Sequence, residues 1–566
     1  MKRSFLLALS VLSVFAVTAA PRSLQEAQQA AAQYFTSHSN VLRAPQHGNA
    51  MKHVWTAMQP DGEPAFFVFN RGENDGFILI SAEDGTRTVL GYSDNGHFAE
   101  DELSEGARAW LDEYRFAIHH VAKSSASTEP LPVPQSPAKT YTPVAPICKT
   151  LWDQGDPYNL LCPKKNGVLT QTGCVATAAA QIMKVYNHPA QGTGSHSYYW
   201  KRGTDDEVQL SVDFSTATYQ WNLMKNSYKG TATQDSKNAV ATLMYHCGVA
   251  CNMAYGLRSA GGSWAYFDDM MYGLINYFGY DKGIRTIAKD YMGEELFLDS
   301  VYADLKAGYP VYFFARTVKD EGHAFVCDGM DANGLVHINW GWGGSSDAYY
   351  PVSVMDPENQ GAGGSVGNNA YVIRVCAYTH IRPNKNEAAR HTFTCGPMRV
   401  ENERFARDEL PSISLDTLQN YSLYRWSGKR ALMLYKDGRF FGVYNHDAAG
   451  NLDPYYYYYY FRIRPSLQSV PEGDYTVIPV ITDDDRPGVY EPVYSRGNGL
   501  CRCPMRVTAD SIFMGKNAVP DPQGIEEVFE NANPQVLKVL KEGRLFIEKN
   551  GHIYDAEGRK VTTTGK

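Results

Sequence analysis

The sequence predicts a multidomain protein of the α+β class with a β-rich C-terminal third. At 566 residues the chain is too long for a single hydrophobic core. In its middle part, helical patterns come first and strand patterns follow, which is typical of an α+β domain. Further on, residues 392–463 and 475–481 are rich in tyrosine, valine and arginine and carry short polar turns. That pattern indicates a β-sandwich.

Composition excludes several functions. The net charge of -8 is spread without a basic block, so we expect no nucleic-acid partner. Ten cysteines are sparse for a disulfide-stapled scaffold, and no two pairs have zinc-ligand spacing. We therefore predict no metal and no cofactor, and we interpret most of the thiols as core residues.

The N-terminus has the pattern of a secretory signal. A basic start, Met1-Lys2-Arg3, precedes an apolar run from Phe5 to Ala16 and then small residues. We predict a signal peptide over residues 1–19, with Ala19 as its last residue. No later segment approaches the ~20 apolar residues of a membrane span, so we expect export and no stable membrane insertion.

Residues 20–140 predict a small α+β unit. A capped helix is expected over residues 23–35, followed by an antiparallel meander over 65–69, 76–80 and 88–91 and a helix over 105–120. A linker rich in proline and small polar residues then runs over residues 124–146. Two interpretations of this linker stay open: the junction between a pro-segment and an enzyme, or an ordinary interdomain hinge.

The third unit, residues 141–383, contains one cysteine placed as a nucleophile would be. Cys174 follows Gly173 at the start of a helical pattern that ends at Pro189, and Thr172 offers a cap. A thiol in the first helical turn is near the positive end of the macrodipole, which favours the thiolate. The alternative is a small buried hydrophobic residue.

The same unit supplies a candidate base on strands. After helices expected over 235–247 and 264–278, strands are expected over 310–316, 322–328, 335–340 and 370–378. His323 begins one of them, and a hairpin can bring Asn339 beside it to hold the imidazole tautomer. His337 is the rival base. The indoles of Trp340 and Trp342 could shield the His–Asn bond or simply fill the core.

Three stretches resemble the streptopain family of secreted papain-like cysteine proteases: WDQGDPYNLLCP, QTGCVATAAAQIMKVYNHP and GHAFVCDGMDANGLVHINWGWGGSSDAYY. The string FFVFNRGENDGFILISAED is similar to the propeptide of that family, and the Cys174-to-His323 gap is that of papain-like enzymes. The resemblance covers roughly residues 20 to 380. It implies a papain-like domain over 141–383, a propeptide over 20–140 that acts as the inhibitor, and protein or peptide substrates.

The resemblance also implies residue roles. Cys174 would be the nucleophile and His323 the base, with Asn339 and Trp340 orienting and covering the imidazole. Gln154 would donate a hydrogen bond to the oxyanion. The substrate-binding loop would include a set of small residues: Gly256, Ser259, Gly261, Gly262 and Ser263. At Cys327 the chain departs from the aliphatic residue usual in the family, and we interpret this thiol as a core residue.

Beyond Pro383 the resemblance stops. We expect a β-rich, sandwich-like domain over 384–530 and a possible sorting tail over 531–566, which resembles the C-terminal tails of secreted Bacteroidetes proteins. Six consecutive tyrosines, 455–460, predict either a core-plus-edge strand or an adhesive surface. The resemblance implies that the chain is a secreted cysteine endopeptidase made as a latent zymogen. Its two rival functions are a non-catalytic adhesin on a protease-like scaffold and a thiol acyl transferase.

Overall fold

The computed structural model describes residues 21–39, 42–46, 49–125, 139–201, 206–316, 322–353, 374–496, 499–515, 536–541, 544–549 and 552–554. Contacts divide the chain into two compact units. The first comprises residues 1–99, 114–138 and 354–371, and the second comprises 100–113, 139–353 and 372–566. The expected signal peptide and residues 126–138 of the linker lie outside the described residues. Within the described part, no helix has the length and apolarity needed to cross a membrane.

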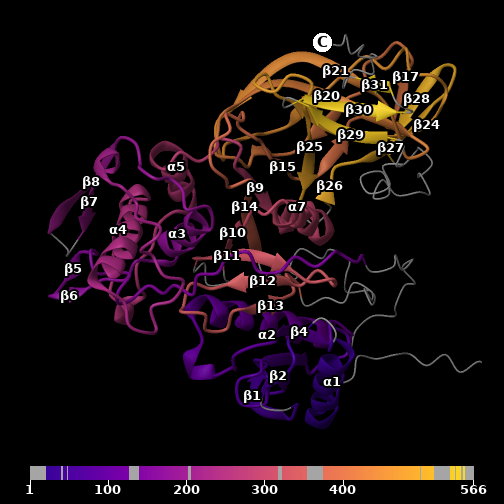
Figure 1. Cartoon of the computed structure of the whole chain (residues 1–566). Helices are drawn as coiled ribbons and strands as arrows, with labels where there is room; N and C mark the ends of the chain where they lie inside the picture. Colours follow the sequence, from indigo (N-terminus) through magenta and orange to yellow (C-terminus); the bar gives the residue numbers. More distant parts are fainter. Residues whose placement is uncertain are drawn as a thin grey trace, which may run out of the picture. The chain divides into compact units, whose positions relative to one another are not determined.

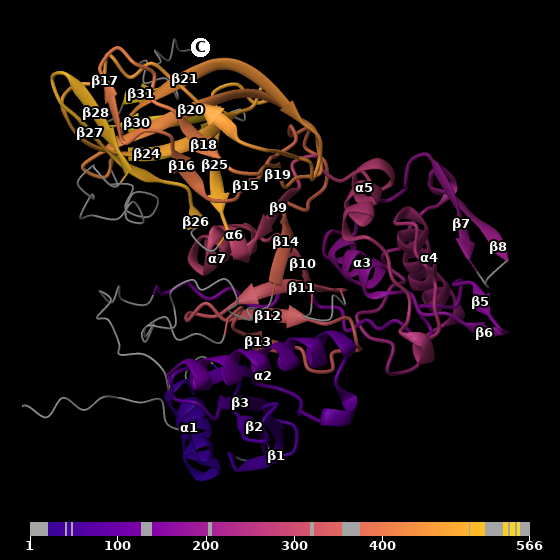
Figure 2. The ribbon, with the colours of Figure 1, turned by 180° about the vertical axis from the view of Figure 1, so that it is seen from behind.

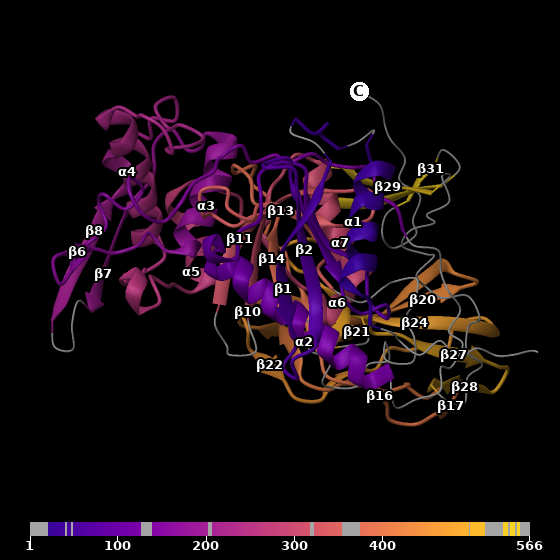
Figure 3. The ribbon, with the colours of Figure 1, turned by 90° about the horizontal axis from the view of Figure 1, so that it is seen from below.

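The first unit is the expected meander with one additional strand. Helix α1, Leu24–Ser37, begins at a capping box in which the Ser23 and Glu26 side chains bond each other's backbone. It packs on an antiparallel sheet of order β1-β2-β3-β4, in which β1 and β2 run side by side (Figure 3). The strands are β1 Met51–Met58, β2 Pro64–Arg71, β3 Phe77–Ser81 and β4 Val89–Ser93. Strand β1 was absent from the sequence prediction.

Helix α2, Glu105–Ser125, contributes to both units, because residues 105–113 belong to the second. The sequence predicts this helix over 105–120, so its start is confirmed and its end lies further on. A short 3₁₀ turn, η1 Glu100–Glu102, precedes it.

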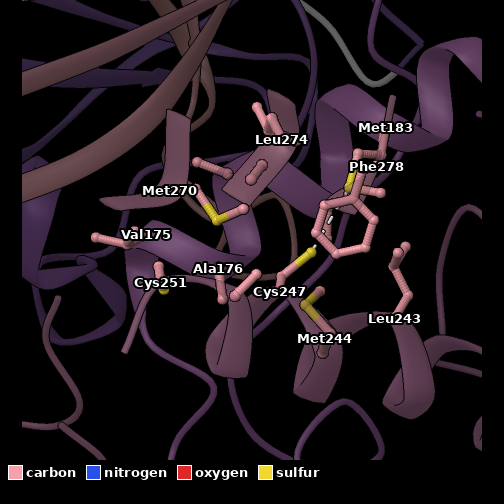
Figure 4. Close-up of a cluster of buried hydrophobic side chains, with 14 of the residues drawn as sticks. Val175, Ala176, Met183, Leu243, Met244, Cys247, Cys251, Met270, Leu274 and Phe278 are labelled. Carbon is pink, nitrogen blue, oxygen red and sulfur yellow. Dashed lines mark hydrogen bonds between the residues drawn. The ribbon is translucent and has the colours of Figure 1, made fainter. Parts of the chain in front are cut away.

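The helical side of the second unit is built on α3, Cys174–Tyr186. It packs against α4, Gln234–Ala250, and α5, Phe267–Tyr277 (Figure 1). Figure 4 shows the apolar faces of these helices meeting, with the Cys247 thiol 3.6 Å from the Met183 sulfur. All helical residues from Val175 to Met183 are buried, so this packing holds Cys174 in place.

The strand side of the second unit is an antiparallel sheet of order β13-β12-β11-β10-β14-β9. Its strands are β9 Arg285–Ala288, β10 Val311–Arg316, β11 Gly322–Met330, β12 Val336–Asn339, β13 Ala348–Tyr350 and β14 Arg374–Thr379. Helices α6 Lys289–Met292 and α7 Glu294–Lys306 lie between β9 and β10 along the chain. The predicted order of helices before strands is confirmed, and with it the α+β class. Smaller elements are β5 Lys164–Lys165, β6 Val168–Leu169, β7 Ser195–Lys201, β8 Glu207–Asp213, η2 Phe214–Thr216 and η3 Arg258–Ala260.

The C-terminal region is β-rich, as expected, and has its own apolar core. Strands β20, β24, β27 and β28 follow one another across a large curved sheet (Figure 2), and β16, β18 and β23 form a separate small one. The strands are β15 Phe393–Cys395, β16 Met398–Val400, β17 Arg404–Ala406, β18 Ile413–Leu415, β19 Leu418–Asn420, β20 Trp426–Lys436, β21 Arg439–Leu452, β22 Tyr457–Tyr458, β23 Phe461–Ile463, β24 Gly473–Thr482, β25 Tyr490–Ser495, β26 Gly499–Leu500, β27 Cys503–Val507 and β28 Ser511–Met514.

This C-terminal region is not packed as an independent module. Leu423 lies in the same buried cluster as the residues of α3, α4 and α5, and the Tyr272 hydroxyl donates to its carbonyl at 2.5 Å. The Thr392 hydroxyl donates to the Thr286 carbonyl at 2.6 Å. A hydrophobic core that draws on both regions makes each depend on the other for stability.

The tyrosine run does not form the expected core-plus-edge strand. Tyr455 is an anchor whose hydroxyl bonds Asp268, whereas the next five tyrosines are all exposed and only Tyr457–Tyr458 is a strand. Left-handed backbone angles at Tyr455 and Tyr460 break the extended conformation at both ends of the run, which explains the difference. Beyond it, β29 Val536–Lys541, β30 Arg544–Lys549 and β31 His552–Tyr554 form the short antiparallel strands expected in the tail.

Candidate functional site

Cys174 is the first residue of α3, and a glycine without a side-chain cap precedes it. Gly173 is the N-cap, with φ 86° and ψ 143°, a conformation that L-residues rarely adopt. A Cβ at this position would also lie 2.8 Å from the Met253 sulfur. The predicted cap at Thr172 is wrong, because its hydroxyl pairs with the Thr177 hydroxyl at 2.9 Å instead.

The surroundings of Cys174 in this form of the chain make its thiol harder to ionise. Burial raises the pKa of the thiol, and the Glu105 carboxylate at the start of α2 raises it further. Hydrogen bonds from the Ala324 and Val175 backbone oppose that rise. The helix dipole alone would favour the thiolate, but the cost of desolvating that charge is larger and raises the pKa of the thiol. The hydrogen bond from Ala324 also locates the sulfur beside β11, one residue after His323.

His323 occupies the start of β11, as predicted, and pairs across the sheet with Ala315. Alternation along β11 gives His323 the same face as Phe325, and the Phe325 ring lies 4.7 Å from the Trp340 ring. A Cβ built on Gly106 would lie 3.8 Å from the His323 Cβ and 3.1 Å from the Trp340 ring. The first turn of α2 thus lies directly over these two candidate residues.

Trp340 is buried between the sheet and α2. The Trp110 ring of α2 contacts it edge-on at 5.8 Å, and its indole N–H donates to the Ser346 carbonyl at 3.0 Å. Its backbone N–H donates to Asp347 at 2.9 Å. Burial raises the pKa of the Asp347 carboxyl to about 7, although His337 opposes the rise.

Asn339 lies on the other face of the hairpin. It pairs directly with Val326, and paired side chains lie on the same face of a sheet. The Asn339 carboxamide therefore points toward α3, whereas the His323 Cβ lies on the opposite face. Its Nδ2 donates to the Thr150 carbonyl at 2.7 Å, and its Oδ1 accepts from Gln181 Nε2 at 3.0 Å. Orientation of His323 by Asn339 stays a prediction. The rival base His337 is bound to Asp328, with Nδ1 and Oδ1 2.6 Å apart.

Gln154 is buried next to the chain that leads into α3. Its carbonyl accepts a hydrogen bond from the Thr172 N–H at 3.1 Å, two residues before Cys174. The backbone thus brings Gln154 near the thiol, as an oxyanion donor requires.

The candidate substrate loop lies against the same approach to α3. The Ser263 hydroxyl donates to the Gln171 carbonyl at 2.7 Å, and the Gln171 N–H donates to the Gly256 carbonyl at 3.0 Å. At Gly256 a Cβ would lie 2.0 Å from the Gly262 carbonyl oxygen, so residue 256 has no room for a side chain. Ser259 and Gly261 are exposed at the tip.

Arg258 joins this loop to the glycine-rich turn after Trp340. Its guanidinium lies 4.7 Å from the centre of the Trp342 ring, a cation–π distance. The sequence predicted core packing or shielding for Trp342 and did not predict this contact, because no local pattern pairs residues 84 positions apart. Gly106 and Trp110 were missed for the same reason. Among the described residues, no cluster of three or more His, Cys, Asp or Glu could hold a metal.

Two family models match the chain. The peptidase C10 family model matches residues 152–350, and the Spi protease inhibitor model matches residues 17–118. The thiol protease/hemagglutinin PrtT of Porphyromonas gingivalis is 32% identical over 404 residues, which are 69% of this chain and 45% of PrtT. The chain thus spans less than half the length of that relative. Streptopain of Streptococcus pyogenes is 31% identical over 328 residues, which are 54% of this chain and 78% of streptopain.

Two solved structures of Prevotella intermedia are also similar. A prointerpain A fragment is 33% identical, covering 58% of this chain and 98% of the fragment, with a TM-score of 0.48. Active interpain A is 35% identical, covering 44% of this chain and 98% of its own, with a TM-score of 0.37. The match to streptopain covers more than three quarters of that enzyme. The chain therefore belongs to the peptidase C10 family of cysteine proteases, with a Spi-type inhibitor segment at its N-terminal side.

Proposed function

We propose that the chain is an exported cysteine endopeptidase made as a latent precursor. The Cys174 thiolate attacks a peptide carbonyl, and Gln154 and the Cys174 N–H stabilise the oxyanion. His323, as imidazolium, protonates the leaving amine, and water then hydrolyses the acyl-enzyme. Protein and peptide chains are the substrates. The Gly256–Ser263 loop forms one wall of the cleft that binds them.

One observation carries the proposal: Cys174 begins α3, and its sulfur accepts a hydrogen bond from the backbone at Ala324, the residue after His323. Nucleophile and base therefore come from elements that touch each other, although they are 149 positions apart in the sequence. Latency is supported by residues 105–113 of α2. Gly106 approaches His323 and Trp340 closely, and Glu105 disfavours the thiolate.

The test compares the purified wild-type chain with Cys174→Ala and Cys376→Ala after limited proteolysis of the 126–138 segment. Cys376 is a second thiol that is only partly buried, so it is a matched control. We expect the wild-type chain and Cys376→Ala to cleave casein. We expect Cys174→Ala and His323→Ala to have lost this activity. Iodoacetamide should label Cys174 of the processed form fastest. Equal casein cleavage by Cys174→Ala would overturn the assignment.

Export is proposed from residues 1–19, and removal of the precursor segment from the composition of residues 124–146. N-terminal sequencing of the secreted and the active forms tests both together. We expect the secreted form to begin at residue 20 and the active form within or just after the linker. An active form that still begins before residue 100 contradicts the latency mechanism.

A second, adhesive role is favoured by the exposed tyrosines. Tyr456 is 69% exposed and Tyr459 65% exposed, and such clusters of aromatic surface are typical of binding sites. One relative is named a thiol protease/hemagglutinin. We expect the full-length Cys174→Ala chain to agglutinate erythrocytes and to lose this activity when Tyr456, Tyr457, Tyr459 and Tyr460 are changed to serine. Unchanged agglutination removes the tyrosines from that role.

A further inference from the structure

Two thiols touch inside the C-terminal core. The sulfur atoms of Cys395 and Cys501 are 3.3 Å apart, and each residue is only 3% exposed. The pair lies in the buried cluster that fills the C-terminal region. The other described sulfur contacts are with different groups, such as the Met183 sulfur for Cys247 and the Tyr421 hydroxyl for Cys376.

The backbone holds this pair in register from both sides. Cys395 ends β15, which pairs in parallel with β25 and aligns Cys395 with Ser495. Cys501 follows β26, and its N–H donates to the Val493 carbonyl of β25 at 2.9 Å. Both cysteines are therefore fixed to the same strand. A disulfide needs a sulfur–sulfur separation of about 2.05 Å, so closure requires the two sulfurs to approach by little more than 1 Å.

In the folded, reduced protein the pair is poorly reactive. The pKa of the Cys501 thiol is raised, first by its hydrogen bond with Cys395 and then by burial. Because the thiolate is the nucleophile in exchange, and because burial excludes an external oxidant, a bond between these sulfurs forms while the chain is folding. An exported chain meets its oxidants at that stage.

We propose that Cys395 and Cys501 form a structural disulfide when the chain folds outside the cytoplasm, an inference that rests on the proposed export. One thiol loses its proton and attacks the disulfide of a thiol–disulfide oxidoreductase, giving a mixed disulfide and one oxidoreductase thiolate. The second cysteine, after losing its proton, displaces the other oxidoreductase sulfur. The cysteine pair is oxidised by two electrons, the oxidoreductase is reduced to its dithiol, and the net proton count is unchanged.

This bond would close a long loop. The cysteines are 106 positions apart and lie near the two ends of the C-terminal core, so a link restricts most of that region in the unfolded chain. It would also secure β15, which begins one residue after Thr392, the residue that bonds the Thr286 carbonyl. The link therefore strengthens the part of the C-terminal region that touches the peptidase core.

The test uses the full-length Cys174→Ala chain, in which autolysis is avoided, purified from the periplasm of an expression host. Free thiols are blocked with iodoacetamide before digestion, and peptides are identified by mass spectrometry without reduction. We expect a peptide containing Cys395 joined to one containing Cys501, about 2 Da lighter than the two thiol peptides together. Finding both cysteines alkylated, or Cys501 joined to Cys503, overturns the proposal.

Variants supply the matched control. Cys503 is buried in the same core two residues from Cys501. We expect Cys395→Ser and Cys501→Ser each to abolish the linked peptide and to lower the Tm by about 10 °C, whereas Cys503→Ser keeps the link. If the serine variants do not fold, the mass spectrum of the parent chain decides alone.

Refolding of the denatured chain in a glutathione redox buffer repeats the measurement without any need for export. A linked Cys395–Cys501 peptide supports the proposal there too, and two alkylated cysteines in the refolded protein count against it. Casein cleavage by the wild-type chain is measured separately. A chain that cleaves casein but has free Cys395 and Cys501 thus refutes the disulfide and leaves the peptidase assignment standing. A chain that contains the Cys395–Cys501 link but does not cleave casein supports the disulfide and counts against the peptidase assignment.

Discussion

The Tyr455 hydroxyl donates a hydrogen bond to Asp268 Oδ1 at 2.9 Å and so joins the C-terminal region to the first turn of α5. The Tyr378 hydroxyl bonds the same carboxylate oxygen. A carboxylate in the first turn of a helix is stabilised by the helix dipole, and these two phenols fix its position. Since α5 follows the Gly256–Ser263 loop closely, the C-terminal region holds the base of the candidate substrate loop.

Leu423→Ala tests this dependence. Leu423 is 2% exposed in the cluster that contains α3, so its truncation should lower the free energy of unfolding by about 3 kcal/mol. Urea denaturation of the Cys174→Ala chain, followed by tryptophan fluorescence, provides the measurement. Leu410→Ala is the control, because Leu410 is 53% exposed, and its effect should stay within about 0.5 kcal/mol. Equal effects of the two substitutions would show that the regions are independent.

The pH dependence of Cys174 alkylation should differ between precursor and processed enzyme. In the precursor, burial and the Glu105 carboxylate raise the pKa of the thiol, so its alkylation rate rises only at high pH. Removal of residues 105–113 takes away the Glu105 carboxylate and lets water reach the surface that α2 covers, so the midpoint of the rate profile should move to lower pH. Glu105→Gln in the precursor should shift it in the same direction by a smaller amount.

Iodoacetamide labelling quantified at Cys174 by mass spectrometry provides these profiles. Cys376 of the same samples serves as the internal control, because its profile should not change on processing. A Cys174 midpoint that stays fixed, or that moves to higher pH after processing, contradicts this account of latency.

Arg258 should affect substrate binding more than chemistry. An exposed cation–π contact contributes about 0.5–1 kcal/mol, so loss of the Arg258–Trp342 contact in Arg258→Ala should raise KM about two- to five-fold with kcat nearly unchanged. Arg258→Lys keeps a cation over the ring and should have a smaller effect. Peptide hydrolysis by the processed enzyme gives both constants. A fall in kcat at constant KM would place Arg258 in the chemistry instead.

Asp347 should make the precursor less stable as the pH rises. Its pKa is raised to about 7 in the folded chain against about 4 in an unfolded one. A carboxyl with a raised pKa stabilises the fold fully below about pH 4, and this stabilisation is lost as the pH increases through about 7. Urea midpoints from pH 4 to 8 should therefore fall less in Asp347→Asn than in its parent. The pKa of Asp304 is raised to about 6, and this residue titrates in both proteins. Its contribution to the pH dependence therefore cancels when the urea midpoints of the two proteins are subtracted.

Local patterns were sufficient for most elements of the fold. The α1 capping box, the start of α2 at Glu105 and the strand that carries His323 as its second residue all depend on short stretches of sequence. The spacing of apolar residues also predicted that Cys174 begins a helix. These features could be predicted because their causes lie within a few residues of one another.

Most of the features that were missed depend on partners distant in the sequence, such as the contact of Trp342 with Arg258. The Thr172 hydroxyl is an exception, because it bonds Thr177, five residues away, rather than capping α3. The direction of the Asn339 carboxamide follows from its pairing with Val326. A hairpin prediction does not fix the strand register to within one residue, and a shift of one residue moves a side chain to the other face. The pKa of the Cys174 thiol is raised first by burial and further by Glu105 of α2, and neither cause can be predicted from the helix dipole alone.

The edge-on contact between Trp110 and Trp340 should make the intrinsic tryptophan fluorescence of the precursor sensitive to the position of α2. The centres of the two indole rings lie 5.8 Å apart and the ring planes are inclined by 71°, with Trp110 on α2 and Trp340 directly after β12. When the helix leaves, Trp340 exchanges an aromatic neighbour for water, and its emission should move to longer wavelength. Maturation could then be followed continuously in a fluorimeter, without any added dye or substrate.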